Sequence, residues 1–262
     1  MTDYRLWQID AFADRVFAGN PAAVVPLDTW PADALLQDIA AENNLAETAF
    51  FVPEGDGFHL RWFTPTVEMD LCGHATLASA WLLFNVLHPG RRHVAFRTLS
   101  GALTVTSDGD WLMLDFPARP AVPTTAPAEL VAALGGVPPR EALKANFWLL
   151  VYADAATVRG MQPDFGALAR VPPGCVIVTA PGEHGHDFVS RFFAPGVGID
   201  EDPVTGGAHC TLVPYWAARL GRSDLMAFQA SRRGGVLRCT AAGDRVRMAG
   251  TARLYLEGMI HV

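Results

Sequence analysis

Apolar and polar positions alternate along much of the chain, with β-branched and aromatic residues between turn signals, and this pattern predicts many short strands. The clearest in the first half cover residues 4–12, 22–27, 48–52, 93–98, 102–107 and 111–116. One early helix interrupts them, because Pro31 suits a first helical turn and Asn43-Asn44 is a stop signal. The predicted fold class is α+β, with mostly antiparallel, curved sheets.

A stretch of small residues punctuated by four prolines follows the strand at 111–116 and ends before a helical pattern that begins near Ala128. This stretch is the predicted domain boundary. It gives an N-terminal domain of residues 1–118 and a C-terminal domain of residues 119–262. This division allows the extreme C-terminal strand to return to the first domain.

The two halves contain the same features in the same order. Each has a strand, a glycine-rich turn and a strand that ends in an Arg-aromatic-Phe-x-Pro block, which is Arg61–Pro65 in one half and Arg191–Pro195 in the other. In each half a loop and a helix opened by glycine follow, near Gly73 and Gly206. This internal repeat predicts two pseudo-symmetric domains, each with one of these helices at its centre.

Each glycine-rich helix start can bind an anion. The segments are Gly73-His74-Ala75 and Gly206-Gly207-Ala208. A helix N-terminus has unsatisfied N–H groups and the positive end of the helix dipole, which together suit a small carboxylate. The alternative is that the glycines only allow tight turns. Their repeat-equivalent positions favour a shared site in a cleft between the halves.

Glu47 is a candidate acid–base residue. It follows the predicted end of the first helix and immediately precedes the apolar strand at 48–52. Bulky apolar neighbours would desolvate its carboxyl group and raise its pKa, which suits a group that moves a proton between substrate atoms. The alternative is an ordinary surface carboxylate at a turn.

Three further residues stand at the helix starts. His74 and Asp202 could orient or protonate a substrate, although a buried structural histidine and a helix cap are the alternatives. Cys72 is where a thiolate would be stabilised, as in a racemase that uses one cysteine from each half. The second half has no cysteine before its glycines, so a packed small residue is the preferred interpretation of Cys72.

Composition and charge exclude several classes of function. Half of the 262 residues are hydrophobic and the net charge is −7, which leaves no broad basic surface for nucleic acid. No apolar run reaches the roughly 20 residues of a membrane helix. The N-terminus has no secretory signal pattern, so a cytoplasmic protein with four reduced cysteines is expected. No metal site is expected, because His184 and His186 fall in a glycine-rich hairpin loop.

Several motifs together resemble the phenazine-biosynthesis PhzF-like family, related to diaminopimelate epimerase and proline racemase. The resemblance runs nearly end to end, through Asp10-Ala-Phe, Phe17-Ala-Gly-Asn-Pro21, Asn44-Leu-Ala-Glu-Thr48, Arg61-Trp-Phe-Thr-Pro65, Leu71-Cys-Gly-His-Ala-Thr76, Glu201-Asp-Pro-Val-Thr-Gly206 and Ser231-Arg-Arg-Gly-Gly235. It implies an epimerase-like fold of two domains, each a curved sheet around a central helix, with the active site between them, and a homodimer.

The resemblance also implies a cofactor-independent isomerase of a small carboxylate. Glu47 would move the proton, with His74 and Asp202 as further catalytic positions and Asn20, Gly73, Ala75, Gly206 and Gly207 on the substrate side. Many relatives have serine where this chain has Gly207, so a hydroxyl group that could bond the substrate is missing. Two alternatives stay open: a thiol-based racemase or epimerase of an amino or hydroxy acid using Cys72, and a non-catalytic anion-binding protein.

Overall fold

A computed structural model of the chain describes residues 2–262, which divide into two compact units. Unit 1 extends to Asp115 and includes the C-terminal segment Ala249–Val262, and unit 2 is Phe116–Met248. The boundary precedes the proline-rich stretch. Among the described residues, no helix has the length and apolar character needed to cross a bilayer. The predicted mixed α+β class, dominated by strands, is confirmed.

Unit 1 is a single curved sheet with two helices. Its strands are β1 (Asp3–Ala11), β2 (Asn20–Pro26), β3 (Glu47–Glu54), β4 (Gly57–Phe63), β5 (Glu68–Met69), β6 (His93–Thr98), β7 (Gly101–Asp108), β8 (Trp111–Pro117) and β18 (Ala252–His261). Its helices are α1 (Asp33–Asn43) and α2 (Gly73–Leu82), and α2 continues as the π-helical turn η1 (Leu83–Leu87). The C-terminal strand β18 pairs antiparallel with β1.

Unit 2 contains the remaining elements. Its strands are β9 (Val122–Pro123), β10 (Glu141–Lys144), β11 (Trp148–Val151), β12 (Val176–Pro181), β13 (Phe188–Ala194), β14 (Ile199–Asp202), β15 (Asp224–Gln229), β16 (Gly235–Ala242) and β17 (Arg245–Gly250). Its helices are α3 (Ala128–Ala133), α4 (Ala155–Gly160), α5 (Phe165–Ala169) and α6 (Gly206–Leu220), with a 3₁₀ turn, η2 (Pro195–Val197).

The strand pairings of unit 1 recur in unit 2 in the same order. In unit 1, β2 pairs parallel with β3, β3 antiparallel with β4, and β4 antiparallel with β5 and parallel with β6. In unit 2, β11, β12, β13, β14 and β15 make the same succession of parallel and antiparallel pairs. The repeat seen in the sequence is therefore a repeat of topology, as predicted.

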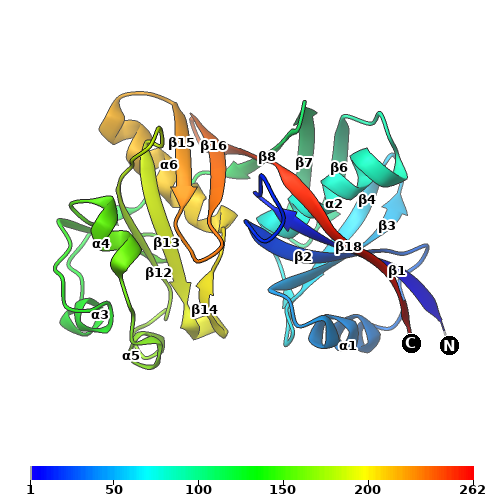
Figure 1. Ribbon diagram of the computed structural model, residues 1–262, viewed down its shortest axis with the longest axis horizontal. Helices are drawn as coiled ribbons and strands as arrows, with labels where there is room; N and C mark the ends of the chain where they lie inside the picture. The colour runs from blue at the N-terminus through cyan, green and yellow to red at the C-terminus, as the bar shows by residue number, and fades with distance from the viewer. Residues whose placement is uncertain (1) are drawn as a thin grey trace. The chain divides into compact units, whose positions relative to one another are not determined.

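Each unit has one helix against the inner face of its sheet. Eight of the ten residues of α2 are buried, and α2 contacts β1, β2 and β3, which surround it in Figure 1. Small residues such as Ala75, Ala78 and Ala80 let these strands approach the helix closely. Its counterpart α6 packs on β15 and β16. Both helices begin at the predicted glycines.

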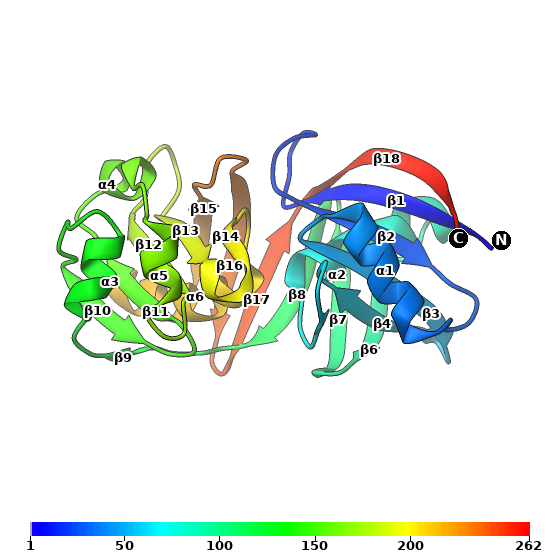
Figure 2. The same cartoon turned by 90° about the horizontal axis from the view of Figure 1, so that it is seen from below.

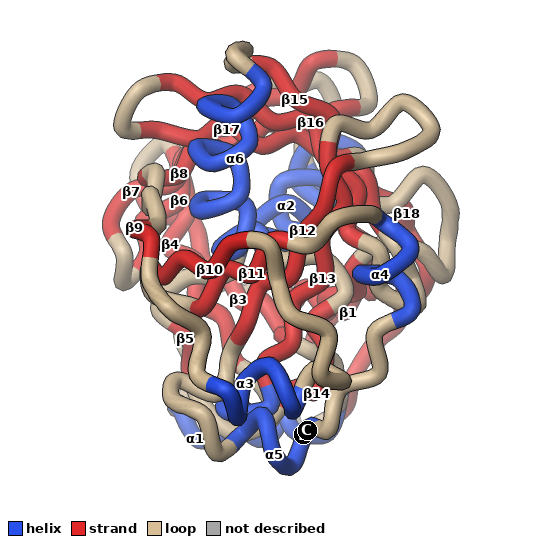
Figure 3. The backbone as a smooth tube through the Cα atoms, turned by 90° about the vertical axis from the view of Figure 1, so that its left-hand side faces the viewer, coloured by secondary structure: helices blue, strands red, loops and turns tan. Residues whose placement is uncertain are grey.

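The outer faces of the sheets are covered by other helices. In unit 1, Leu36 and Ile39 of α1 pack with Val25 and Phe50 of the sheet, and Figure 2 shows α1 lying over β2 and β3. In unit 2, short helices α3, α4 and α5 cover strands β11–β13, as seen in Figure 3. Burial on both faces explains why the central strands have nearly continuous apolar sequences.

The arginine of each repeated block makes an equivalent interaction. Arg61 on β4 binds both oxygens of Glu68 on β5, at 2.7 Å each, and Arg191 on β13 binds both oxygens of Glu201 on β14, at 2.7 and 2.9 Å. Both guanidinium groups also lie over the aromatic ring two residues later. In each unit, the arginine of the repeated block thus holds a short strand against a longer one, β5 against β4 and β14 against β13.

We predict that Arg191→Ala lowers the free energy of unfolding by about 3 kcal/mol, measured by urea denaturation, because it leaves Glu201 without its partner in a largely buried place. Nη1 of Arg191 also donates to the carbonyl oxygens of Val158 and Met161. Arg61→Ala is the matched control and should cost less, since its Nη1 bonds the exposed Asp33 instead. Equal losses in the two variants would contradict this.

Candidate active site

The strand that carries Asn20 is preceded by a fixed loop. The carboxylate of Asp10 accepts a hydrogen bond from the backbone N–H of Phe17 at 2.8 Å, and Asp10 is 1% exposed. Gly19 has a φ of +62°, and a Cβ there would lie 2.1 Å from the carbonyl oxygen of Ala11. The loop therefore requires glycine at this position, and it delivers Asn20, fully buried, to the start of β2.

Glu47 is placed by the end of α1. Asn44 ends the helix in the left-handed conformation, with a φ of 48°, and the amide of Asn43 donates to the hydroxyl group of Thr48 at 3.2 Å. Glu47 is the first residue of β3 and lies opposite Ala22 of β2. Its side chain therefore points into the unit at the same sheet end as Asn20, and the residue is 9% exposed. The surface alternative for Glu47 does not apply.

The N-terminus of α2 brings two more side chains to this place. Nε2 of His74 lies 3.2 Å from Oε2 of Glu47, and Nδ1 lies 3.1 Å from the amide nitrogen of Asn20. The sulfur of Cys72, the N-cap residue, lies 3.6 Å from the same Nδ1. His74 and Cys72 are 4% and 5% exposed. Asn20, Glu47, Cys72 and His74 thus form one buried polar cluster within unit 1.

The contacts define the charge state of His74. An amide nitrogen can only donate, so Nδ1 accepts from Asn20, and the ring proton lies on Nε2, facing the Glu47 carboxylate. Burial lowers the pKa of His74 to about 3, so the imidazole is neutral at physiological pH. The contact is therefore that of a neutral histidine lying 3.2 Å from a buried carboxyl group, not that of a charged ion pair.

Unit 2 holds Asp202 in a different network. Its Oδ2 accepts from the hydroxyl group of Thr205 at 2.5 Å, and its carbonyl oxygen accepts from the amide of Gln229 at 2.7 Å. Gln229 is fully buried and its Oε1 accepts from the Thr205 N–H at 2.9 Å. Ser231 donates to the carbonyl oxygen of Pro203 at 2.8 Å. The half-buried Asp202 therefore belongs to a rigid turn that leads into α6.

The predicted substrate-side glycines and alanine lie in the first turns of the two central helices. Gly73 and Ala75 flank His74 in α2, and Gly206 and Gly207 open α6. A Cβ built on Gly207 would meet no heavy atom within 4 Å, so the absent serine side chain leaves open space. Crowding therefore does not require a glycine at position 207.

Sequence reasoning missed how closely some of these groups are joined. Gln229 carries no sequence signal, because a glutamine at a strand end is ordinary. The proximity of Cys72 and His74 to Glu47 depends on the parallel pairing of β2 with β3 and on α2 packing against them. One ligand-type atom from each of Glu47, Cys72 and His74 lies within 4.8 Å of the others. Spacing along the chain gave no hint of that.

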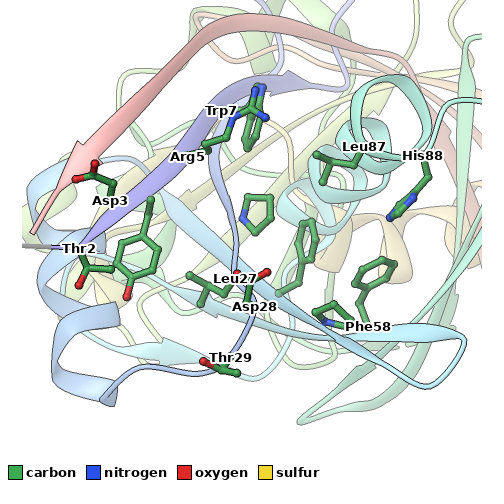
Figure 4. A pocket seen from close by; sticks show the side chains of 14 residues that line it. Thr2, Asp3, Arg5, Trp7, Leu27, Asp28, Thr29, Phe58, Leu87 and His88 are labelled. Atoms are coloured by element: carbon green, nitrogen blue, oxygen red, sulfur yellow. The ribbon is translucent and has the colours of Figure 1, made fainter.

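A separate hollow of about 610 Å³ lies at the other end of β3 in unit 1. Figure 4 shows Trp7, Phe58, Asp3, Arg5 and Asp28 among the side chains that line it. Its arginine already binds Glu257 and lies over the Trp7 ring. None of the predicted site residues lines this hollow.

We predict that the His74 imidazole stays neutral, with its proton on Nε2, from pH 8 down to about pH 4. Burial lowers its pKa, so the unfolded chain binds a proton at His74 below about pH 6.5 while the folded chain does not. The free energy of unfolding therefore falls as the pH drops below 6.5, by up to about 1.4 kcal/mol per pH unit. Imidazole ¹⁵N shifts in the presence of a chelator measure this, with assignment by loss of the signal in His74→Gln. A charged ring at pH 6 would contradict it.

Comparison with known proteins identifies the family. Residues 9–258 match the family model described as phenazine biosynthesis-like protein. An uncharacterized isomerase of Pseudomonas aeruginosa is 50% identical over 257 residues, which cover 98% of both chains. A crystal structure of a PhzF-family phenazine biosynthesis protein from Enterococcus faecalis matches with a TM-score of 0.96 and 46% identity over the whole of both chains.

A more distant match concerns the fold alone. The crystal structure of a hydroxyproline epimerase from Agrobacterium vitis has a TM-score of 0.63 and 10% identity, and the match covers 98% of this chain and 92% of that one. The predicted epimerase-like fold is therefore confirmed. On the family model, the sequence identity and the whole-chain structural match, the chain belongs to the PhzF phenazine biosynthesis-like family.

Proposed function

We propose that this protein is a cofactor-independent isomerase that moves a proton between carbon atoms of a small carboxylate substrate, with the Glu47 carboxyl group as the acid–base. The class of enzyme rests on relatives: the Pseudomonas aeruginosa protein that shares half of the residues is named an isomerase. The mechanism rests on one observation, which is the buried contact of 3.2 Å between Glu47 and a histidine held neutral by its surroundings.

A proton transfer of this kind needs one group that can accept and then return a proton. The carboxylate of Glu47 would take a proton from a substrate carbon, and the resulting carboxylic acid would deliver it to another carbon of the same molecule. The Nε2 edge of His74 supports this by packing 3.2 Å from the carboxyl group and so limiting its orientation. Asn20 in turn fixes the imidazole tautomer, since its amide donates to Nδ1.

The N-termini of helices α2 and α6 support a substrate that carries a carboxylate group. The first N–H groups of α2 and α6 belong to residues 73–75 and 206–208, where the side chains are small enough to let an anion approach the backbone. Asp202 is proposed as a second group that orients or protonates the substrate. The turn from Asp202 to Thr205, held by Gln229, supports a fixed geometry for that carboxylate.

A thiol-based racemase or epimerase is the second candidate, because the Cys72 sulfur lies 3.6 Å from a histidine nitrogen that could accept its proton. Unit 2 offers no matching thiol at the start of α6, where Thr205 is the N-cap residue. Cys210 is buried inside that helix, and burial raises the pKa of its thiol to about 11. A two-cysteine mechanism therefore lacks its second member, which favours Glu47.

We also propose that the protein acts as a homodimer. Support comes from β18, which exposes Leu254, Tyr255, Leu256 and Met259 on its surface, and from Phe17, whose ring packs on Tyr255 at 5.6 Å while staying 67% exposed. Exposed apolar groups gathered on one strand are typical of a contact surface.

Light scattering after gel filtration should give a mass of two chains, and Tyr255→Glu should shift it to one. A monomeric wild-type protein would overturn the proposal.

We predict that Glu47→Gln abolishes exchange of substrate C–H protons with deuterated solvent, with a loss of about 10²-fold or more, while substrate binding is largely kept. The amide keeps the shape of the side chain but cannot titrate. A panel of small unsaturated carboxylates followed by proton NMR provides the measurement. Cys72→Ala should retain most of the exchange rate.

The matched control is Glu54→Gln, because Glu54 ends the same strand β3 but pairs with Arg97 at the surface. It should exchange like the wild type. An inactive Cys72→Ala together with an active Glu47→Gln would replace the carboxyl mechanism by the thiol-based racemase.

A further inference from the structure

The buried cluster of unit 1 contains three different kinds of metal ligand. Glu47 offers a carboxylate, Cys72 a thiol and His74 an imidazole, and one such atom from each lies within 4.8 Å of the others. Each residue is 9% exposed or less. The backbone positions are fixed independently of any ligand, since Glu47 opens β3, and Cys72 and His74 open a helix packed against β2 and β3.

We propose that Cys72, His74 and Glu47 form a binding site for a thiophilic divalent cation of the zinc class. Neighbouring ligand atoms of a tetrahedral zinc site lie roughly 3.4–3.6 Å apart, given zinc–ligand bonds of about 2.0–2.3 Å. Sγ of Cys72 and Nδ1 of His74 already stand 3.6 Å apart. Because the three ligand atoms already lie within 4.8 Å of one another, any remaining separation has to shorten by about 1.4 Å at most. A fourth position is left for water or another small ligand.

The chemistry of the cluster selects the kind of cation. When the metal–sulfur bond forms, the thiol releases its proton to solvent, and no electron transfer is involved. Thiolate and carboxylate then carry two negative charges that balance the two positive charges of the metal. Mg²⁺ and Ca²⁺ need six or more oxygen ligands and gain little from sulfur and nitrogen, so they are discriminated against. The N-terminus of α2 stabilises the thiolate that zinc requires.

Occupation of this site has a consequence for the reaction proposed above. The metal would bind the lone pair of Nδ1 that now accepts a hydrogen bond from Asn20, and it would hold the carboxylate of Glu47. A carboxylate bound to a cation is a poor proton acceptor. The cation is therefore an inhibitor of the isomerase and not its cofactor. This consequence rests on the proposed function, but the existence of the site does not.

The test is a titration of the reduced, metal-free full-length protein with Co²⁺, which reports its ligands by absorption. We expect a thiolate-to-cobalt charge-transfer band in the near ultraviolet that disappears in Cys72→Ala. Cys175→Ala is the matched control, because it removes a buried thiol from unit 2, and it should keep the band. His74→Gln should weaken zinc binding by at least about tenfold in a competition with a chelating dye. No band in the wild type, or a band kept in Cys72→Ala, overturns the proposal.

A second measurement uses only the wild-type protein and so does not depend on whether a variant folds. Zn²⁺ should slow the alkylation of Cys72 by iodoacetamide by at least about tenfold, quantified by mass spectrometry of the peptide that contains it, while Mg²⁺ should have no effect. An unchanged rate with Zn²⁺ overturns the site. Neither measurement involves a substrate, so either result is independent of whether Glu47 proves to be the acid–base.

Discussion

The structure of each unit depends on one constraint, which is that a helix lies against the inner face of a curved sheet. In unit 1, strands β1, β2 and β3 all contact α2, and most of the buried residues of this helix are small or apolar, which lets the strands approach it closely. A helix buried in this way can satisfy its backbone internally everywhere except at its ends. The candidate site of unit 1 is accordingly gathered at the N-terminus of α2.

That location explains why a histidine and a carboxylate can be buried together. Burying either group alone would cost several kcal/mol, and the cost is reduced here because each polar atom of the imidazole faces a partner. Asn20 donates to Nδ1 and Oε2 of Glu47 lies 3.2 Å from Nε2, while burial keeps the ring neutral. A neutral histidine beside Glu47 suits the proton transfer proposed for that carboxyl group.

Much of the fold could be predicted from the sequence because the same pattern of strands, turn and helix occurs in both halves. The strands at 4–12, 93–98 and 111–116 correspond closely to β1, β6 and β8, and both helices begin at the predicted glycines. The repeated arginine blocks marked equivalent strands, and their salt bridges with Glu68 and Glu201 are equivalent too. The partners of these arginines were not predicted, because they lie on two- and four-residue strands whose sequences carry no periodic signal.

The candidate site was only partly predictable, for a different physical reason. Position beside an apolar strand suggested that Glu47 is desolvated, and the structure buries it. Its contact with His74 joins residues 27 positions apart, and that of Asn20 with His74 joins residues 54 apart. Such contacts depend on strand register, where a slip of one residue would turn Glu47 to the other face of the sheet. Local patterns do not determine register between parallel strands separated by a helix.

The two halves differ at the starts of their central helices. Unit 1 has a cysteine at the N-cap and a histidine in the first turn of α2, whereas unit 2 has Thr205 and Gly207 at the corresponding places of α6. Thr205 is engaged by Gln229 and Asp202, and Gly207 faces open space. A symmetric pair of thiols, as a two-base racemase requires, has no place in unit 2 without rebuilding that network. The asymmetry therefore supports the proposal that the proton chemistry belongs to the single carboxyl group of unit 1.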